Sequence, residues 1–166
     1  MGFKSIFEFS QSWDDQQLDG DNSQRYVQDR NALALAAPLV IEDTDSETHA
    51  VFHERRTLAS GGSYAYDLAG GIVDHFGVLR TFSKVKRIIL LNLSTANSSI
   101  LELGAGSNAF AAWLGASGDI VTVHPGGDFI IGSPLLGYTV TAGTADILTV
   151  TAGDVTQYDI AIIGVV

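Results

Sequence analysis

The stretch Ile147-Leu-Thr-Val-Thr-Ala-Gly-Asp-Val-Thr-Gln-Tyr-Asp-Ile-Ala-Ile-Ile-Gly-Val-Val166 decides the fold, because it holds two apolar runs on either side of the turn signal Gly153-Asp154. Short runs of this kind that end at glycine-rich turns are typical of β-strands, so we expect strands at 147–151 and 158–166. In the second run both faces become apolar toward its end, which indicates a central strand covered on both sides. A second subunit is one way to supply that cover.

The same pattern extends back to residue 51. Further short apolar runs predict strands at 51–58, 63–68, 85–93, 99–103, 120–124, 128–131 and 138–141, with Gly-rich turn signals between them. This regular spacing predicts an all-β domain over 51–166, either a β-sandwich or a jelly roll. Two segments, 72–79 and 108–114, are expected to form one or two helical turns inserted between strands.

Residues 1–50 have a different composition from the rest of the chain. They hold ten of the nineteen acidic residues and only three of the nine cations. Alternation in the run 3–9 places Phe3, Phe7 and Phe9 on one face of a strand. We interpret residues 1–50 as an N-terminal extended arm with short strands, of the kind that packs on a neighbouring subunit. Extra strands on the same domain are the alternative interpretation.

The composition excludes several classes of function. All nine cations lie at or before Arg87, so residues 88–166 cannot hold a phosphate by charge or build an arginine–carboxylate clamp. The net charge of −10 argues against nucleic acid and anionic membranes as partners. Cysteine is absent, and no apolar run approaches the ~20 residues of a membrane helix, so we expect a soluble protein. The 46% hydrophobic content favours an oligomer or a docked partner.

The run Ile100-Leu-Glu-Leu-Gly-Ala-Gly-Ser-Asn108 resembles the first motif of S-adenosylmethionine-dependent methyltransferases. That resemblance implies a cofactor at Gly104 and Gly106, between a strand and the start of a helix. The pattern departs from the motif at Asn108 and at His124, where the ribose-binding carboxylate is missing, and no second crossover helix follows. We therefore interpret the run as a strand that ends in a Gly-rich turn.

Other candidate sites are equally incomplete. An EF-hand starting at Asp15 fails at Gln17 and Tyr26, which leaves only a looser Asp-rich calcium site as an alternative. His49 and His53 share a strand face but would lie ~13 Å apart, too far for one metal ion. No Ser-His-Asp elbow is present. Trp13, Trp113 and the tyrosines suit sugar stacking or, by default, core packing. The sequence predicts no catalytic, cofactor-binding or metal-binding residue.

Four segments carry a second resemblance. They are Phe110-Ala-Ala-Trp-Leu-Gly115, Val123-His-Pro-Gly-Gly-Asp-Phe129, Gly137-Tyr-Thr-Val-Thr-Ala-Gly-Thr-Ala-Asp-Ile-Leu-Thr-Val150 and Tyr158-Asp-Ile-Ala-Ile-Ile-Gly164. In these segments the chain resembles the small β-rich structural proteins encoded among the virion genes of tailed bacteriophages. The resemblance implies a non-enzymatic virion protein, first of all a capsid decoration (cement) protein on the capsid surface, with no catalytic residues to carry over. A tail, neck or fibre component is the alternative within the same class.

This hypothesis also predicts the partners. The major capsid protein or other virion proteins would be bound, and a homo-oligomer is expected, with a trimer favoured because cement proteins often trimerise over capsid symmetry axes. Two hypotheses from other classes remain open: a carbohydrate- or receptor-binding β-sandwich, and a methyltransferase-like enzyme.

Overall fold

The computed structural model describes residues 13–18, 24–29, 49–74 and 77–166 of the chain. The chain divides into two compact units, Met1–Ser46 and Glu47–Val166. In the first unit, β1 (Trp13–Leu18) pairs antiparallel with β2 (Gln24–Asp29), so the acidic stretch contains two strands. The strand expected at 3–9 lies outside the described residues, and the role of residues 1–50 as an arm stays a prediction.

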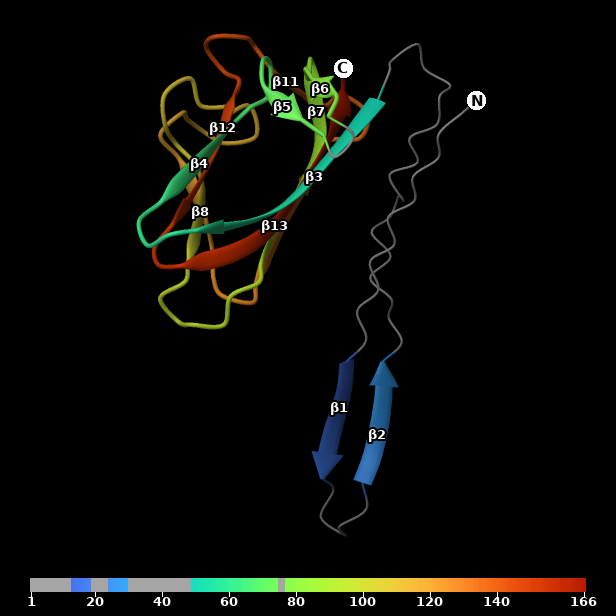
Figure 1. Cartoon of the computed structure of the whole chain (residues 1–166). Helices are drawn as coiled ribbons and strands as arrows, with labels where there is room; N and C mark the ends of the chain where they lie inside the picture. Colours follow the sequence, from blue (N-terminus) through green and yellow to red (C-terminus); the bar gives the residue numbers. More distant parts are fainter. Residues whose placement is uncertain (1–12, 19–23, 30–48, 75–76) are drawn as a thin grey trace. The chain divides into compact units, whose positions relative to one another are not determined.

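The second unit is a sandwich of two antiparallel sheets (Figure 1). The five-stranded sheet has the order β10-β7-β13-β3, with β11 also paired to β7, and the four-stranded sheet has the order β4-β12-β8-β9. Their strands are β3 (His49–Leu58), β4 (Ser63–Asp67), β7 (Lys84–Asn92), β8 (Leu101–Gly104), β9 (Ile120–Val123), β10 (Asp128–Gly132), β11 (Tyr138–Thr139), β12 (Ile147–Ala152) and β13 (Thr156–Val165). No helix occurs among the described residues, and the predicted all-β sandwich is confirmed.

Most successive strands lie in opposite sheets. The chain crosses the sandwich between β3 and β4, β7 and β8, β9 and β10, β11 and β12, and β12 and β13. By contrast, β8 and β9 lie in one sheet, and so do β10 and β11. The jelly-roll topology stays a prediction. The strand orders make β3 and β4 the outermost strands of their sheets on one side of the sandwich, and β10 and β9 the outermost strands on the other.

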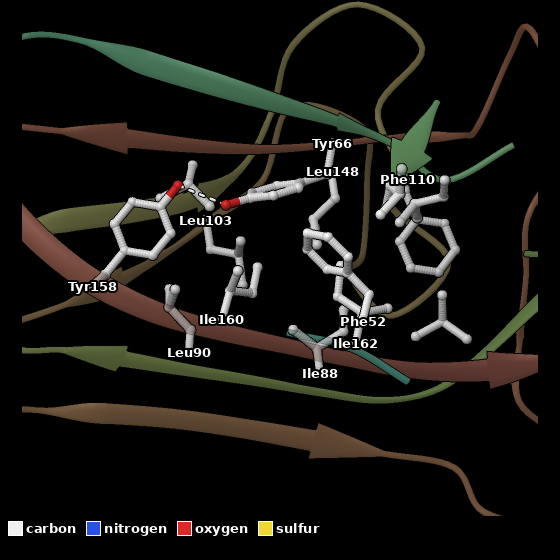
Figure 2. Packing of buried hydrophobic residues seen from close by; sticks show 14 of the residues in the cluster. Phe52, Tyr66, Ile88, Leu90, Leu103, Phe110, Leu148, Tyr158, Ile160 and Ile162 are labelled. Carbon is white, nitrogen blue, oxygen red and sulfur yellow. Dashed lines mark hydrogen bonds between the residues drawn. The ribbon is translucent and has the colours of Figure 1, made fainter. Parts of the chain in front are cut away.

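The core lies between the sheets and is built by alternate residues of the long strands (Figure 2). Tyr158, Ile160 and Ile162 of β13 are fully buried, as are Leu148 and Val150 of β12. Side chains of a strand point to opposite faces in turn, so every second residue of each strand enters the core. Each large apolar side chain buried in this way stabilises the fold by roughly 1.5–3 kcal/mol.

Strand β13 is central, as its sequence predicts. It pairs with β7 along one side and with all ten residues of β3 along the other. Ala161 and Ile163, which lie between the core-facing residues, are buried as well. The register shifts between Ile163 and Gly164, and a Cβ at Gly164 would overlap the carbonyl oxygen of Lys84. A second subunit as the cover of this face stays a prediction.

Both helical predictions are wrong. Residues 72–79 contain β5 (Ile72–Val73), which pairs with β6 (Leu79–Arg80). Asp74 stabilises the reversal, because its carboxylate accepts a hydrogen bond from the Val78 amide and pairs with Arg80. In 108–114, a left-handed Asn108 (φ 53°) and a bridge from Ala109 to Ile147 hold the backbone out of a helix.

Candidate functional site

The glycine-rich run at the end of β8 turns the chain into the connection 105–119, which leads to the antiparallel strand β9. Positive φ angles occur at Gly104, Ala105, Gly106 and Asn108. A Cβ at Gly104 would lie only 2.5 Å from the carbonyl oxygen of Asp119, so glycine is required there by close backbone approach. Because β8 pairs antiparallel with β9, the strand–helix–parallel strand arrangement of a nucleotide-binding motif is absent from this segment. The interpretation as a turn is confirmed.

Among the described residues, the histidines of β3 do not belong to a group that could hold a metal ion, and Glu47 lies outside these residues. His49 and His53 both lie on this strand, as expected, while Glu54 points to the opposite face from His53. Within the described part of the chain, no group of three or more His, Cys, Asp or Glu side chains could hold a metal ion. Asp15 and Gln17 lie in β1, and the rest of the Asp-rich calcium candidate, 19–21, falls outside the described residues.

The two tryptophans proposed for sugar stacking lie in different units of the chain. Trp113 packs beside Phe129 with ring centroids 5.5 Å apart, and its indole Nε1 donates to the carbonyl oxygen of Phe110. This contact links the loop after β8 to β10, so Trp113 has a packing role. Trp13 lies in β1, in the other unit. Ser133 follows β10 in a loop, and its amide donates to the Lys86 carbonyl.

The side of the sandwich bounded by β3 and β4 holds a pocket of about 230 Å³. Its lining includes Phe52 and Glu54 from β3, Tyr64, Tyr66 and Asp67 from β4, and Ile72 from β5. The sequence alone predicts no pocket here, although two of the tyrosines considered for sugar stacking, Tyr64 and Tyr66, lie in its lining. The sequence feature that could have indicated this pocket is the alternation in β3. It directs the charged side chains of Glu54 and Arg56 to the same face as the buried Phe52.

A polar network lines one wall of this pocket. Arg56 makes two hydrogen bonds to the Glu54 carboxylate, of 2.6 and 3.2 Å, and its guanidinium carbon lies 3.5 Å from the centre of the Tyr64 ring. The Tyr66 hydroxyl donates to Glu54 over 3.1 Å and lies 2.9 Å from the Tyr158 hydroxyl (Figure 2). The network therefore joins both sheets and neutralises the carboxylate with the guanidinium.

The two buried phenols keep their protons at neutral pH. Burial disfavours the phenolate and raises the pKa of Tyr158 to about 12. Burial, together with the neighbouring Tyr158, raises the pKa of Tyr66 far above its usual range. Neither hydroxyl therefore supplies a phenolate nucleophile or base near pH 7. A rigid, aromatic and hydrogen-bonding wall of this kind is suited to binding rather than to proton transfer.

The outer face of the five-stranded sheet, the one turned away from the core, is largely apolar. Its residues follow from the register, because directly opposite residues share a face. The three rows across β10, β7, β13 and β3 are Gly132, Arg87, Ile163 and Val51; then Ile130, Ile89, Ala161 and His53; then Asp128, Leu91, Asp159 and Arg55. Charge is concentrated in the third row, where Arg55 and Asp159 form two hydrogen bonds of 2.7 Å.

The loop from β10 to β11 displays two adjacent leucines to solvent. Leu135 is 91% exposed and Leu136 is 79% exposed. Lys86 holds the loop in place, because its ammonium donates to the Leu135 carbonyl over 2.9 Å. Val73 and Leu79 of the β5–β6 hairpin are also exposed, and this hairpin lies at the same end of the sandwich (Figure 1). These side chains give that end an apolar surface of the kind found at contacts with partners.

Comparisons with known proteins add little. No protein-family model and no curated protein matches the chain. One solved structure similar to this chain is described by the words "Bacillus endospore appendages form a novel family of disulfide-linked pili". It is 9% identical, with a TM-score of 0.35, and the match covers 74% of this chain and 94% of that one. A match this weak carries no argument about fold or function. No helix in the described residues has the length and apolarity that crossing a membrane would need.

Proposed function

We propose that this chain is a non-enzymatic structural protein of a virion, most specifically a capsid decoration protein that stabilises the head by contacts between subunits. The observation that carries the proposal is the exposed apolar surface of Leu135 and Leu136, together with the exposed Ile130 on the outer face of the five-stranded sheet. A structural subunit needs such a surface because non-directional apolar burial drives association. The proposed partners are further copies, as a trimer, and the major capsid protein.

The test is the composition of intact particles. Phage particles from a lysate whose genome encodes this chain would be purified by density gradient, and copy number measured by quantitative mass spectrometry against the major capsid protein. Hundreds of copies per particle would support the decoration role. A few copies, in multiples of three or six, would instead place the chain in the tail, neck or fibre. Absence from particles that retain their other minor proteins would refute the virion assignment.

A carbohydrate- or receptor-binding module is the second candidate, and the pocket between β3 and β4 favours it. Tyr64 and Tyr66 offer ring surface, while Glu54 and Asp67 offer carboxylate oxygens to sugar hydroxyls. Glycan-array binding that is lost in Tyr64→Ala and retained in Tyr138→Ala, a partly buried tyrosine outside the pocket, would support this function. Identical glycan binding by both variants would count against the pocket.

A further inference from the structure

The loop between β10 and β11, residues 133–137, presents its two leucines from a backbone that is held in place. The Ser133 amide donates to the Lys86 carbonyl, and the Lys86 ammonium donates to the Leu135 carbonyl, each over 2.9 Å. Leu135 and Leu136 nevertheless stay 91% and 79% exposed. Because the backbone is already fixed, burial of these side chains against a partner would cost little further conformational entropy. We call this segment the leucine loop.

The pocket between β3 and β4 combines a buried apolar floor with an exposed apolar rim. Its buried lining residues include Phe52, Tyr66 and Ile72, and Val73 in the same lining is 54% exposed. Leu79, directly opposite Val73 in the β5–β6 hairpin, is 57% exposed. The volume of about 230 Å³ is below the roughly 300–1,000 Å³ of clefts that hold small molecules. A pocket of this size and lining suits one or two aliphatic side chains.

The leucine loop and the pocket lie at opposite edges of the five-stranded sheet. The loop joins β10 to β11, which both pair with β7 along the edge away from β13, whereas the pocket borders β3. Strands β7 and β13 lie between these edges, so three strand spacings, roughly 14 Å, separate them. The leucines therefore cannot fill the pocket of their own copy. An apolar projection and an apolar recess on different parts of one surface are suited to a head-to-tail contact between copies.

We propose that the leucine loop of one copy inserts into the β3–β4 pocket of a second copy. Charge complementarity orients this contact. The carboxylates of Glu54 and Asp67 stand in the pocket lining, whereas the leucine loop is anchored to β7, a strand that begins with three of the nine cations of the chain. A head-to-tail contact closes into a ring where its rotation permits, as in the proposed trimer. The inserted leucines would leave no room in the pocket for a glycan. This contact rests on the proposed function only in requiring that copies associate.

Cysteine trapping tests the contact, because the chain has no cysteine of its own. Full-length Leu136→Cys protein would be mixed with an equal amount of mass-tagged Val73→Cys protein and oxidised mildly. We expect disulfide-linked dimers that join the two variants, at a clearly higher yield than when Leu136→Cys is mixed with Val155→Cys. Val155 is 59% exposed and lies between β12 and β13, outside both surfaces, so it measures random collision. Equal yields from the two mixtures would overturn the proposal.

A pair of surface variants tests the direction of the contact. The double variant Leu135→Ser, Leu136→Ser removes the projection and keeps the pocket, whereas Val73→Glu places a charge in the pocket and keeps the loop. We expect each variant alone to associate at least about tenfold more weakly than the wild type in sedimentation equilibrium. An equal mixture of the two should form one-to-one dimers, because one intact loop then meets one intact pocket.

Val155→Glu is the matched control for the added charge and should associate like the wild type. A mixture of the two variants that stays monomeric, or a wild-type protein that is monomeric at all concentrations, would refute the head-to-tail contact.

These results are independent of the test for the proposed function. A protein that is absent from phage particles but forms the mixed disulfide would keep the contact and lose the virion role. A particle-bound protein that does not form the mixed disulfide above the control would keep the virion role and lose this contact.

Discussion

Replacing Gly164 with alanine tests the register of the central strand. A Cβ at this position would overlap the carbonyl oxygen of Lys84 and lie 2.8 Å from the Phe82 ring. The carbonyl belongs to the backbone and Phe82 is fully buried, so neither atom can move away cheaply. Overpacking in a close-packed interior costs about 1–3 kcal/mol. Because backbone and core are both affected here, we expect a loss near the upper end, about 3 kcal/mol.

Thermal unfolding measures this loss. For a unit of this size, ~1 kcal/mol corresponds to roughly 4 °C, so the Tm of Gly164→Ala should fall by roughly 10 °C. Gly118→Ala is the matched control, because a Cβ there meets nothing within 4 Å. Its Tm should stay the same or rise slightly, since alanine lowers the entropy of the unfolded chain. If Gly164→Ala unfolds within ~2 °C of the wild type, the pairing of β13 with β7 at the register shift is wrong.

Three further predictions concern other parts of the sandwich. The pKa of tyrosine is near 10 in the unfolded chain, whereas that of Tyr158 is about 12 in the folded protein. The free energy of unfolding that Tyr158 contributes is therefore complete below pH 10 and should fall by up to about 3 kcal/mol as the pH rises through 12. Tyr158→Phe should lack this pH-dependent loss when unfolding is measured in urea. Trp113→Ala removes the contact with Phe129 and should cost about 2 kcal/mol by the same assay, because the side chain is only partly buried. The double variant Leu135→Ser, Leu136→Ser should keep the monomer Tm and weaken self-association in sedimentation; a Tm loss above ~5 °C would show that these leucines pack within their own chain.

The strands of the sandwich could be predicted from local pattern, whereas their partners could not. Runs such as 147–151 combine β-branched residues with glycine turns on both sides, and these signals are local. Pairing depends on contacts far apart in sequence: Arg55 and Asp159, which face each other on β3 and β13, are 104 residues apart. The apolar run 158–166 predicts a central strand, but no spacing rule identifies β7 and β3 as its two neighbours.

The two helical predictions failed because local contacts hold the backbone out of a helix. In 108–114 these are the left-handed Asn108 and the bridge from Ala109 to Ile147. Apolar residues in 72–79 permit a helix, but the Asp74 carboxylate competes for the Val78 amide and closes a turn. Strands β1 and β2 show that a segment can also form strands where its composition does not favour them. Their sequence is rich in Asp and Gln and has a low strand propensity.

The candidate sites needed three-dimensional information. Alternation in β3 shows from sequence that Glu54 and Arg56 share a face with Phe52, but Tyr66 and Tyr158, which complete the network, come from opposite sheets. Arg87 is the last cation of the chain, which the composition makes plain. That its Nε atom is buried without a hydrogen-bond partner depends on the register of β7 and on the glycine opposite it, and no sequence pattern reveals either.

The central place of β13 has a consequence for how this protein is made. A ribosome releases β3 and β7 long before β13, yet β3 obtains its pairing in the five-stranded sheet from β13, and β7 pairs with β13 along the edge opposite β10. Until β13 emerges, these edges of β3 and β7 are unpaired, a state in which intermolecular pairing competes with folding. Synthesis at ~5–20 residues per second makes this wait several seconds long. Yield in a cell should therefore respond more to translation speed and chaperone supply after β7 than to the stability of the finished sandwich.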